Sequence, residues 1–209
     1  MMKEKKSDER KKTLLAESRL AMVKKMHRGT FEKAKEEGKA DELLLPLCGF
    51  VAKTRGYFTS SGCAGRIMLL GLRKGEDKKG SYFHRKWHRT VSLEEVLEAL
   101  GEETEGEVWF KLDPFILHIG AKDLEGAEKI LGAMKKAGVK RGGITVAKPG
   151  KFLVELQGSQ SMSLPVKKGA EILADERLLK FLVEKANKKL QWNYERLKRL
   201  EREFRKELK

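Results

Sequence analysis

Apolar side chains recur at three- and four-residue intervals along several stretches of this chain, and this spacing is typical of amphipathic helices. Asp41, Ser92 with Glu95, Asp123 and Asp175 stand where N-terminal caps are expected. Pro46 favours a kink, or a helix start nearer Leu45. The spacing predicts helices at residues 14–28, 31–37, 42–53, 93–100, 123–137 and 175–209.

Other stretches alternate apolar and polar side chains or run continuously apolar, as strands do. They lie at residues 57–70, 81–90, 107–112, 115–121, 144–147, 152–156 and 163–166. Helices, then strands interleaved with helices, then a long helix predict an α+β domain. We expect a single domain with a mixed β-sheet flanked by helices, and a C-terminal helix about 50 Å long. A doubly wound Rossmann fold is not expected, because the chain lacks its strand, glycine-rich turn and helix.

The net charge of the chain is concentrated at its two ends. The 209 residues carry a net charge of +15, and residues 1–28 and 176–209 each hold +6 of it. We therefore expect a basic helical N-terminal extension (1–28), an α+β body (29–174) and a long basic C-terminal helix packed on the body (175–209). The basic ends are either phosphate-binding helices or solvated helical faces of a thermophile protein.

Composition also bounds the cellular setting. No apolar run is long enough to span a membrane and no signal peptide precedes the body, so we expect a cytoplasmic protein. Cys48 and Cys63 show no paired-cysteine spacing, which predicts neither a disulfide framework nor a metal site.

Residues 57–70 combine a strand pattern with unusual polar chemistry. Three hydroxyls, one thiol, two glycines and Arg66 stand between aromatic and aliphatic residues, where a core strand has no packing use for them. Glycine permits a close backbone approach or a positive φ. The stretch is either a binding site or a β-bulge whose hydroxyls satisfy local backbone groups.

This stretch resembles the signature of the wybutosine-synthesis tRNA methyltransferase family, archaeal type. The resemblance continues in the family's order and spacing through five further segments, to the C-terminus. They are residues 86–88, 113–118, 123–137, 143–146 and 163–165. The helix at residues 14–28 precedes the family's usual start and is either an extension packed on the body or a product of start-site choice.

The resemblance implies a function. Its members methylate nitrogen 4 of a 4-demethylwyosine-type base, 7-aminocarboxypropyl-demethylwyosine, at position 37 of phenylalanine tRNA, with S-adenosylmethionine as the methyl donor. We expect Thr59, Ser60, Gly65, Gly143 and Ile144 to bind this cosubstrate. The cations expected to bind tRNA all lie on the C-terminal helix: Lys198, Arg199, Arg202, Arg205 and Lys206.

The acceptor nitrogen of this family carries a proton until it is methylated, so a base or an anion-stabilising group would help. The candidate catalytic residues are Ser61, Cys63, Arg66, His88 and His118. Taken alone, a histidine in an apolar run such as His118 is more often a hydrogen-bonded core residue. Cys63 is expected to position groups rather than to act as a nucleophile.

At three positions the chain departs from the family. Ala52, Gly62 and Gly142 stand where typical members have Asn, Ser and Ser. If those polar groups are catalytic, the chain is a divergent paralogue, and the alternative function is a non-catalytic or differently specific tRNA-binding protein of the same fold.

Overall fold

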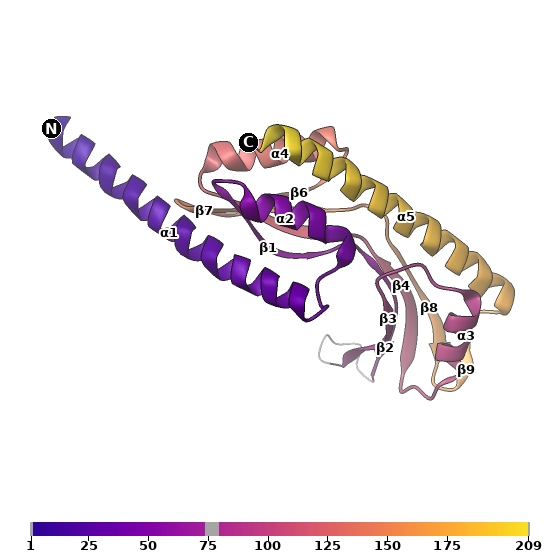
Figure 1. The fold of residues 1–209 in the computed structure, drawn as a ribbon. Helices are drawn as coiled ribbons and strands as arrows, with labels where there is room; N and C mark the ends of the chain where they lie inside the picture. Colours follow the sequence, from indigo (N-terminus) through magenta and orange to yellow (C-terminus); the bar gives the residue numbers. More distant parts are fainter. Residues whose placement is uncertain (1, 74–79, 209) are drawn as a thin grey trace. The chain divides into compact units, whose positions relative to one another are not determined.

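The structure, a computed structural model, describes residues 2–73 and 80–208 and folds them into two compact units (Figure 1). Unit 1 contains the chain up to Cys63, Ile116–Gly158 and the chain from Arg196. Unit 2 contains Ala64–Phe115 and Ser159–Glu195. Both units therefore combine segments that are far apart in the sequence. Their boundaries differ from those of the extension, body and helix expected from the charge pattern.

Unit 1 is a four-stranded antiparallel sheet with helices on both faces. Its strand order is β1 (Tyr57–Cys63), β5 (Ile116–Ala121), β7 (Lys151–Gln157) and β6 (Arg141–Lys148). Its helical elements are α1 (Met2–Glu36), η1 (Glu42–Leu44), α2 (Leu45–Lys53), α4 (Leu124–Lys136) and the end of α5 (Glu176–Glu207).

Neighbouring residues of β1 show which helix covers which face, because successive strand side chains point to opposite sides. The Phe58 ring stacks on His27 of α1, with ring centroids 5.4 Å apart. The Tyr57 ring lies beside Gly126 of α4. Gly120 of β5 leaves room for the Phe58 ring, which a Cβ at that position would meet at 2.0 Å. Helices α1 and α4 thus pack on opposite faces of the sheet.

Helix α1 is one continuous helix, whereas the sequence predicts a break near Gly29. It packs on the rest of unit 1 from Ala16 onward, where Val23 is buried and Arg19 donates to the carbonyl oxygen of Pro149 at 2.7 Å. Helix α1 can approach the turn between β6 and β7 because Gly150 of this turn has no side chain. A Cβ at Gly150 would lie 2.2 Å from the Ala16 carbonyl oxygen. The N-terminal helix is thus an integral part of unit 1.

Unit 2 is a five-stranded antiparallel sheet. Its order is β3 (Ser81–Trp87), β2 (Arg66–Leu72), β4 (Glu107–Asp113), β8 (Met162–Lys168) and β9 (Glu171–Ile172). Helix α3 (Leu93–Gly101) begins with the expected capping box of Ser92 and Glu95. It shares one core with the sheet and with α5 up to Leu190, and Trp87 packs against this core.

The two parts of α5 belong to different units. Asp175 accepts from the backbone N–H of Leu178 at 2.7 Å, as expected of the cap. Apolar residues become sparser after about Leu190, from which we expect the second half of the helix to project or to lie along the surface, yet Leu200 and Phe204 are fully buried. Lys136 at the end of α4 forms an ion pair of 2.5 Å with Glu207. This half packs into unit 1 because its sparse apolar residues still recur on one face.

The expected α+β class is confirmed, but the single mixed sheet is wrong in detail. There are two sheets, and every strand pairing within the described residues is antiparallel. The chain leaves one sheet for the other next to Gly65, whose φ is +104°, and next to Pro114, which has no N–H for a ladder. None of the helices found in the described residues is both long enough and apolar enough to span a membrane.

Candidate active site

Three polar side chains form a hydrogen-bonded row across three strands of unit 1. The register places Ser61 of β1 opposite His118 of β5, and His118 opposite Glu155 of β7. Ser61 Oγ lies 3.0 Å from His118 Nδ1, and His118 Nε2 lies 3.0 Å from Glu155 Oε2. Directly paired strand residues point to the same face. The row is therefore set by strand register rather than by a loop.

A β-bulge selects which serine joins the row. Thr59 pairs with Ile119 and Ser61 with His118, so Ser60 is the extra residue between them. Without the bulge, Ser60 would lie opposite His118. The β-bulge, one of the two interpretations of this stretch, is therefore present, and it places the Ser61 hydroxyl beside the His118 ring.

The partners of His118 define its tautomer. An ionised carboxylate only accepts hydrogen bonds, so the ring proton is on Nε2, and Nε2–H donates a hydrogen bond to Glu155. In a neutral imidazole Nδ1 is then an acceptor, and the Ser61 hydroxyl donates to it. The His118 side chain is 23% exposed, which leaves the row accessible to a ligand. The arrangement resembles that of catalytic serine, histidine and carboxylate groups, in which the hydroxyl can pass its proton to the ring.

A cavity of about 240 Å³ in unit 1 borders this row. The residues of β1 from Thr59 to Gly62 line one wall, and the end of α1, the segment before η1, η1 itself and α2 supply the others. His27, Lys39, Asp41 and Cys48 are among the side chains of those other walls. The cavity therefore brings the central part of the signature stretch together with polar groups that no motif connects.

Two titratable groups of this cavity are held neutral. Burial, and after it the charge of Asp41, raises the pKa of Cys48 to about 12, so Cys48 remains a thiol. Burial, and after it the charge of Lys151, lowers the pKa of His27 from its usual value. His27 is consequently an unprotonated ring at neutral pH, in keeping with its stacking on Phe58.

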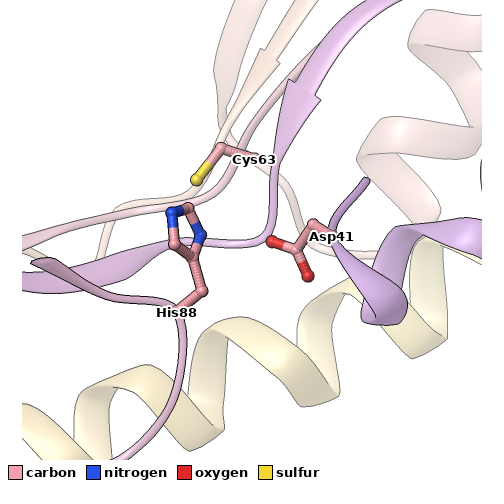
Figure 2. Close-up of side chains that lie close together, drawn as sticks. All are labelled: Asp41, Cys63 and His88. Carbon is pink, nitrogen blue, oxygen red and sulfur yellow. The ribbon is translucent and has the colours of Figure 1, made fainter. Parts of the chain in front are cut away.

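Cys63 ends β1 close to Asp41, which caps η1 through the backbone N–H of Leu43. The Cys63 sulfur and an Asp41 carboxylate oxygen come within 4.8 Å of each other, and both side chains are drawn in Figure 2. His88, the third side chain of that figure, belongs to unit 2 and is described with it.

Three predicted site residues lie in unit 2. Arg66 pairs with Asp113 on the neighbouring strand at 3.1 Å, and its guanidinium lies 4.8 Å from the centroid of the Phe83 ring. These contacts give Arg66 a structural role that the sequence does not reveal. His88 follows β3, where its carbonyl oxygen accepts from the Tyr194 hydroxyl at 3.1 Å. Gly65 precedes β2, and its φ of +104° explains why a glycine stands there.

Gly143 and Ile144 lie on β6, at the far edge of the unit 1 sheet from β1. Three strand spacings separate them from Ser61, which is about 14 Å. Gly143 pairs with Glu155, and a Cβ at Gly143 would meet nothing within 4 Å. The space next to Gly143, beside Glu155 on the sheet, is therefore open. Gly143 does not line the cavity beside Ser61.

The three departures from the family occupy different environments. Ala52 is buried in α2. A Cβ at Gly62 would meet the ends of the Leu117 and Leu44 side chains at 2.7 and 3.0 Å. Gly142 has a φ of +141°, and its Cβ would lie 2.1 Å from the Glu155 carbonyl oxygen. A side chain at 62 thus requires flexible neighbours to move, whereas one at 142 requires the backbone to change.

The five cations predicted to bind tRNA are all exposed on the end of α5. Arg205 forms an ion pair with Glu201 at 2.7 Å and Lys206 one with Glu203 at 2.7 Å. These carboxylates offset part of the charge of Arg205 and Lys206.

Sequence reasoning missed Glu155 and His27. Glu155 stands at an alternating position of its strand, and only the register of β5 and β7 shows that it faces His118. His27 lies in a basic helix before the recognisable motifs, where a lone histidine carries no local signal. Glu155 can be identified only from the strand pairing, and His27 only from the tertiary packing.

Comparison with known proteins gives a consistent result. The family described as "Methyltransferase TYW3" matches residues 9–206. A protein of Thermococcus kodakarensis, named tRNA(Phe) 7-((3-amino-3-carboxypropyl)-4-demethylwyosine(37)-N(4))-methyltransferase 1, is 37% identical over 83% of this chain and 88% of its own. A tRNA wybutosine-synthesizing protein 3 homolog of Danio rerio is 30% identical, over 78% of this chain and 66% of its own.

The fold is similar to that of solved structures as well. A protein from Pyrococcus horikoshii superposes with a TM-score of 0.84 at 35% identity, covering 88% of this chain and 95% of its own. A hypothetical protein from Aeropyrum pernix gives a TM-score of 0.68 at 26% identity, covering 78% of this chain and 96% of its own.

Proposed function

Because the chain belongs to the TYW3 methyltransferase family, we propose that it methylates nitrogen 4 of a 4-demethylwyosine-type base at position 37 of phenylalanine tRNA. The methyl donor of the proposal is S-adenosylmethionine, and the base is the 7-aminocarboxypropyl derivative that the names of its relatives describe. An enzyme of tRNA modification is expected in the cytoplasm. The observation that carries the mechanism is the row of Ser61, His118 and Glu155 beside a cavity.

The row offers a path for the proton that the acceptor nitrogen must lose. Ser61 Oγ takes this proton while its own proton passes to His118 Nδ1. Glu155 stabilises the resulting imidazolium through the hydrogen bond from Nε2. His118 is the proton acceptor in this scheme, Ser61 transmits the proton, and Glu155 fixes the ring.

The cavity wall fits the donor chemically. Thr59 and Ser60 present hydroxyls, Asp41 a carboxylate and Lys39 an ammonium group, and these partners suit the hydroxyl, amino and carboxylate groups of S-adenosylmethionine. When bound, this molecule supplies a methyl group on a positively charged sulfur, which becomes a neutral thioether as the new nitrogen–carbon bond forms. Roles for Gly65, Gly143 and Ile144 in binding it remain predictions from the resemblance.

The remaining catalytic candidates have supporting roles in this proposal. Cys63 lies near Asp41 and positions it without attacking the methyl group, because methylation of a ring nitrogen needs no covalent enzyme intermediate. Roles for Arg66 and His88 of unit 2 at the acceptor base stay predictions.

In this proposal the basic end of α5 binds the phosphate backbone of the tRNA. Lys198, Arg199 and Arg202 are exposed cations on one helix, and contact with phosphates would release counterions from the RNA. Arg205 and Lys206 add to this surface, less strongly because of their carboxylate partners.

A methylation assay separates this function from its alternative. The substrate is phenylalanine tRNA that lacks only the methyl group on nitrogen 4, and the product is identified by mass spectrometry of its nucleosides. Formation of the methylated base supports the proposal. Tight tRNA binding without product would identify the chain as a non-catalytic or differently specific tRNA-binding paralogue.

A further inference from the structure

A second cavity of unit 1 plays no part in the mechanism above. It has a volume of about 490 Å³ and lies between the end of α1, helix α2 and the end of α5. It shares only Phe31 with the cavity beside Ser61. The two cavities are thus neighbours with different linings.

The lining of this second cavity is strongly basic. Arg28, Lys35, Lys53 and Arg205 contribute four cations, of which Arg205 is paired with Glu201, and Glu32 is the one carboxylate among the lining residues in the part of the chain that the structure describes. Such a concentration of positive charge favours a negatively charged ligand.

Aromatic rings accompany these cations. Phe31 and Phe50 line the cavity and are half-buried, and the Arg205 guanidinium lies 4.9 Å from the centroid of the Phe50 ring. Gly49 also borders the cavity, and a Cβ there would meet nothing within 4 Å. Gly49 therefore leaves open space beside Phe50, and a planar group stacked on the Phe50 ring would share it with the Arg205 guanidinium.

Phosphate-binding cations beside an accessible aromatic ring are the chemistry of single-stranded nucleic acid recognition. S-adenosylmethionine suits this lining poorly, because its sulfonium and amino groups outweigh its one carboxylate and leave it positively charged. We propose that this cavity binds an unpaired nucleotide of the tRNA other than the methylated one, with its base on Phe50 and its phosphates on Arg28 and Lys53. The inference rests on the proposed function for the identity of the RNA.

The test measures RNA binding apart from methyl transfer. The probe is a fluorescein-labelled oligouridylate, titrated by fluorescence anisotropy at several salt concentrations. Phe50→Leu keeps an apolar side chain but removes the ring, and we expect binding to weaken roughly tenfold. Phe50→Tyr keeps the ring and should bind within about twofold of the unchanged protein. Arg28→Gln with Lys53→Gln should lower the slope of log affinity against log salt by about 1.4, which corresponds to two phosphate contacts on a single strand.

Two controls make the outcome decisive. Arg177→Gln with Lys180→Gln removes the same charge from exposed positions of α5 and should leave the slope unchanged. Calorimetry with S-adenosylhomocysteine should give the same affinity for the Phe50→Leu variant as for the unchanged protein, and thermal unfolding confirms that each variant is folded. Loss of S-adenosylhomocysteine binding instead of RNA binding would overturn the inference.

The outcomes also separate this inference from the function it rests on. If the unchanged protein methylates tRNA and binds the oligonucleotide, but Phe50→Leu and the double variant bind as well as it does, the inference fails and the function stands. If the unchanged protein neither binds RNA nor methylates tRNA, both fail.

Discussion

The hydroxyl oxygen of Ser61 lies 3.0 Å from Nδ1 of His118, and the bulge at Ser60 is what brings it there. This pairing is the first link of the proposed proton path, and the hydrogen bond between Glu155 and the other nitrogen of the same ring is the second. The path, the residues around it and the stability of the two units can each be tested separately.

Gly142 and Gly62 should respond differently to serine. Gly142→Ser should destabilise unit 1 by about 1–3 kcal/mol, because it puts a side chain at a φ of +141° against the Glu155 carbonyl oxygen. Gly62→Ser should cost less, because only the ends of Leu117 and Leu44 need to move. Chemical denaturation of both variants measures the two costs. An equal or larger cost at Gly62 would mean that the local packing is more rigid than described.

Arg66 should contribute to activity beyond its ion pair. Arg66→Ala and Asp113→Asn both break the pair of 3.1 Å, whose partly exposed side chains predict a coupling of about 0.5–1 kcal/mol. We expect similar losses of thermal stability from the two variants. Methyl transfer should fall far more in Arg66→Ala, because Asp113→Asn leaves the guanidinium in place. Equal activity in the two folded variants would limit Arg66 to its structural role.

The end of α5 should control the salt dependence of tRNA binding. Replacing Lys198, Arg199 and Arg202 with Gln should lower the slope of log affinity against log salt by about 0.7–0.9 for each phosphate that the variant no longer binds. The rate at saturating tRNA should change little, because these cations lie outside the proposed catalytic row. Filter binding of the tRNA at several salt concentrations gives the slope, and an unchanged slope would reduce this surface to a solvated helix face.

Glu95 should make the stability of unit 2 depend on pH. Its hydrogen bond with Arg89, followed by that from the backbone of Ser92, lowers the pKa of Glu95 to about 2. A carboxyl whose folded pKa lies below its unfolded value, about 4.3, stabilises the fold above that unfolded value. This stabilisation is lost as the pH falls toward about 2.

Thermal unfolding of the Glu95→Gln variant tests this effect. Its melting temperature should lie below that of the unchanged protein near neutral pH, and the difference should shrink as the pH falls below about 4. Glu98→Gln removes the same charge from the same helix outside the capping box and is the matched control. A difference that stays constant with pH would contradict the assignment.

Local sequence signals are sufficient for most of the individual elements. The caps at Asp41, Ser92, Asp123 and Asp175 all form, because a short polar side chain before an apolar period satisfies backbone N–H groups at a helix start. Pro46 lies at the start of α2, where its missing N–H costs nothing. Gly29, by contrast, remains inside α1, because packing of Ala16, Arg19 and Val23 on unit 1 outweighs its low helix propensity.

The site was only partly predictable from the sequence. The composition around Ser61 and the resemblance point to this strand and to His118, but they do not identify Glu155, because strand partners depend on the register between distant segments. The division into two sheets was not predicted either. Gly65 and Pro114 are visible as irregular positions, but nothing local shows that the strands on either side pair with different partners.

A double-mutant cycle on Ser61 and His118 shows whether the two side chains act as one proton path. Single-turnover methyl transfer to the demethylated tRNA is measured for Ser61→Ala, for His118→Asn and for the variant carrying both changes, each at saturating tRNA and S-adenosylmethionine. If the two side chains form one proton path, each single change should lower the rate about 100-fold or more. The double variant should then be no slower than the slower single variant, because removing either group already interrupts the path. If the rate losses of the two single variants multiply in the double variant, or if either single variant keeps its full rate, the two side chains do not form one proton path.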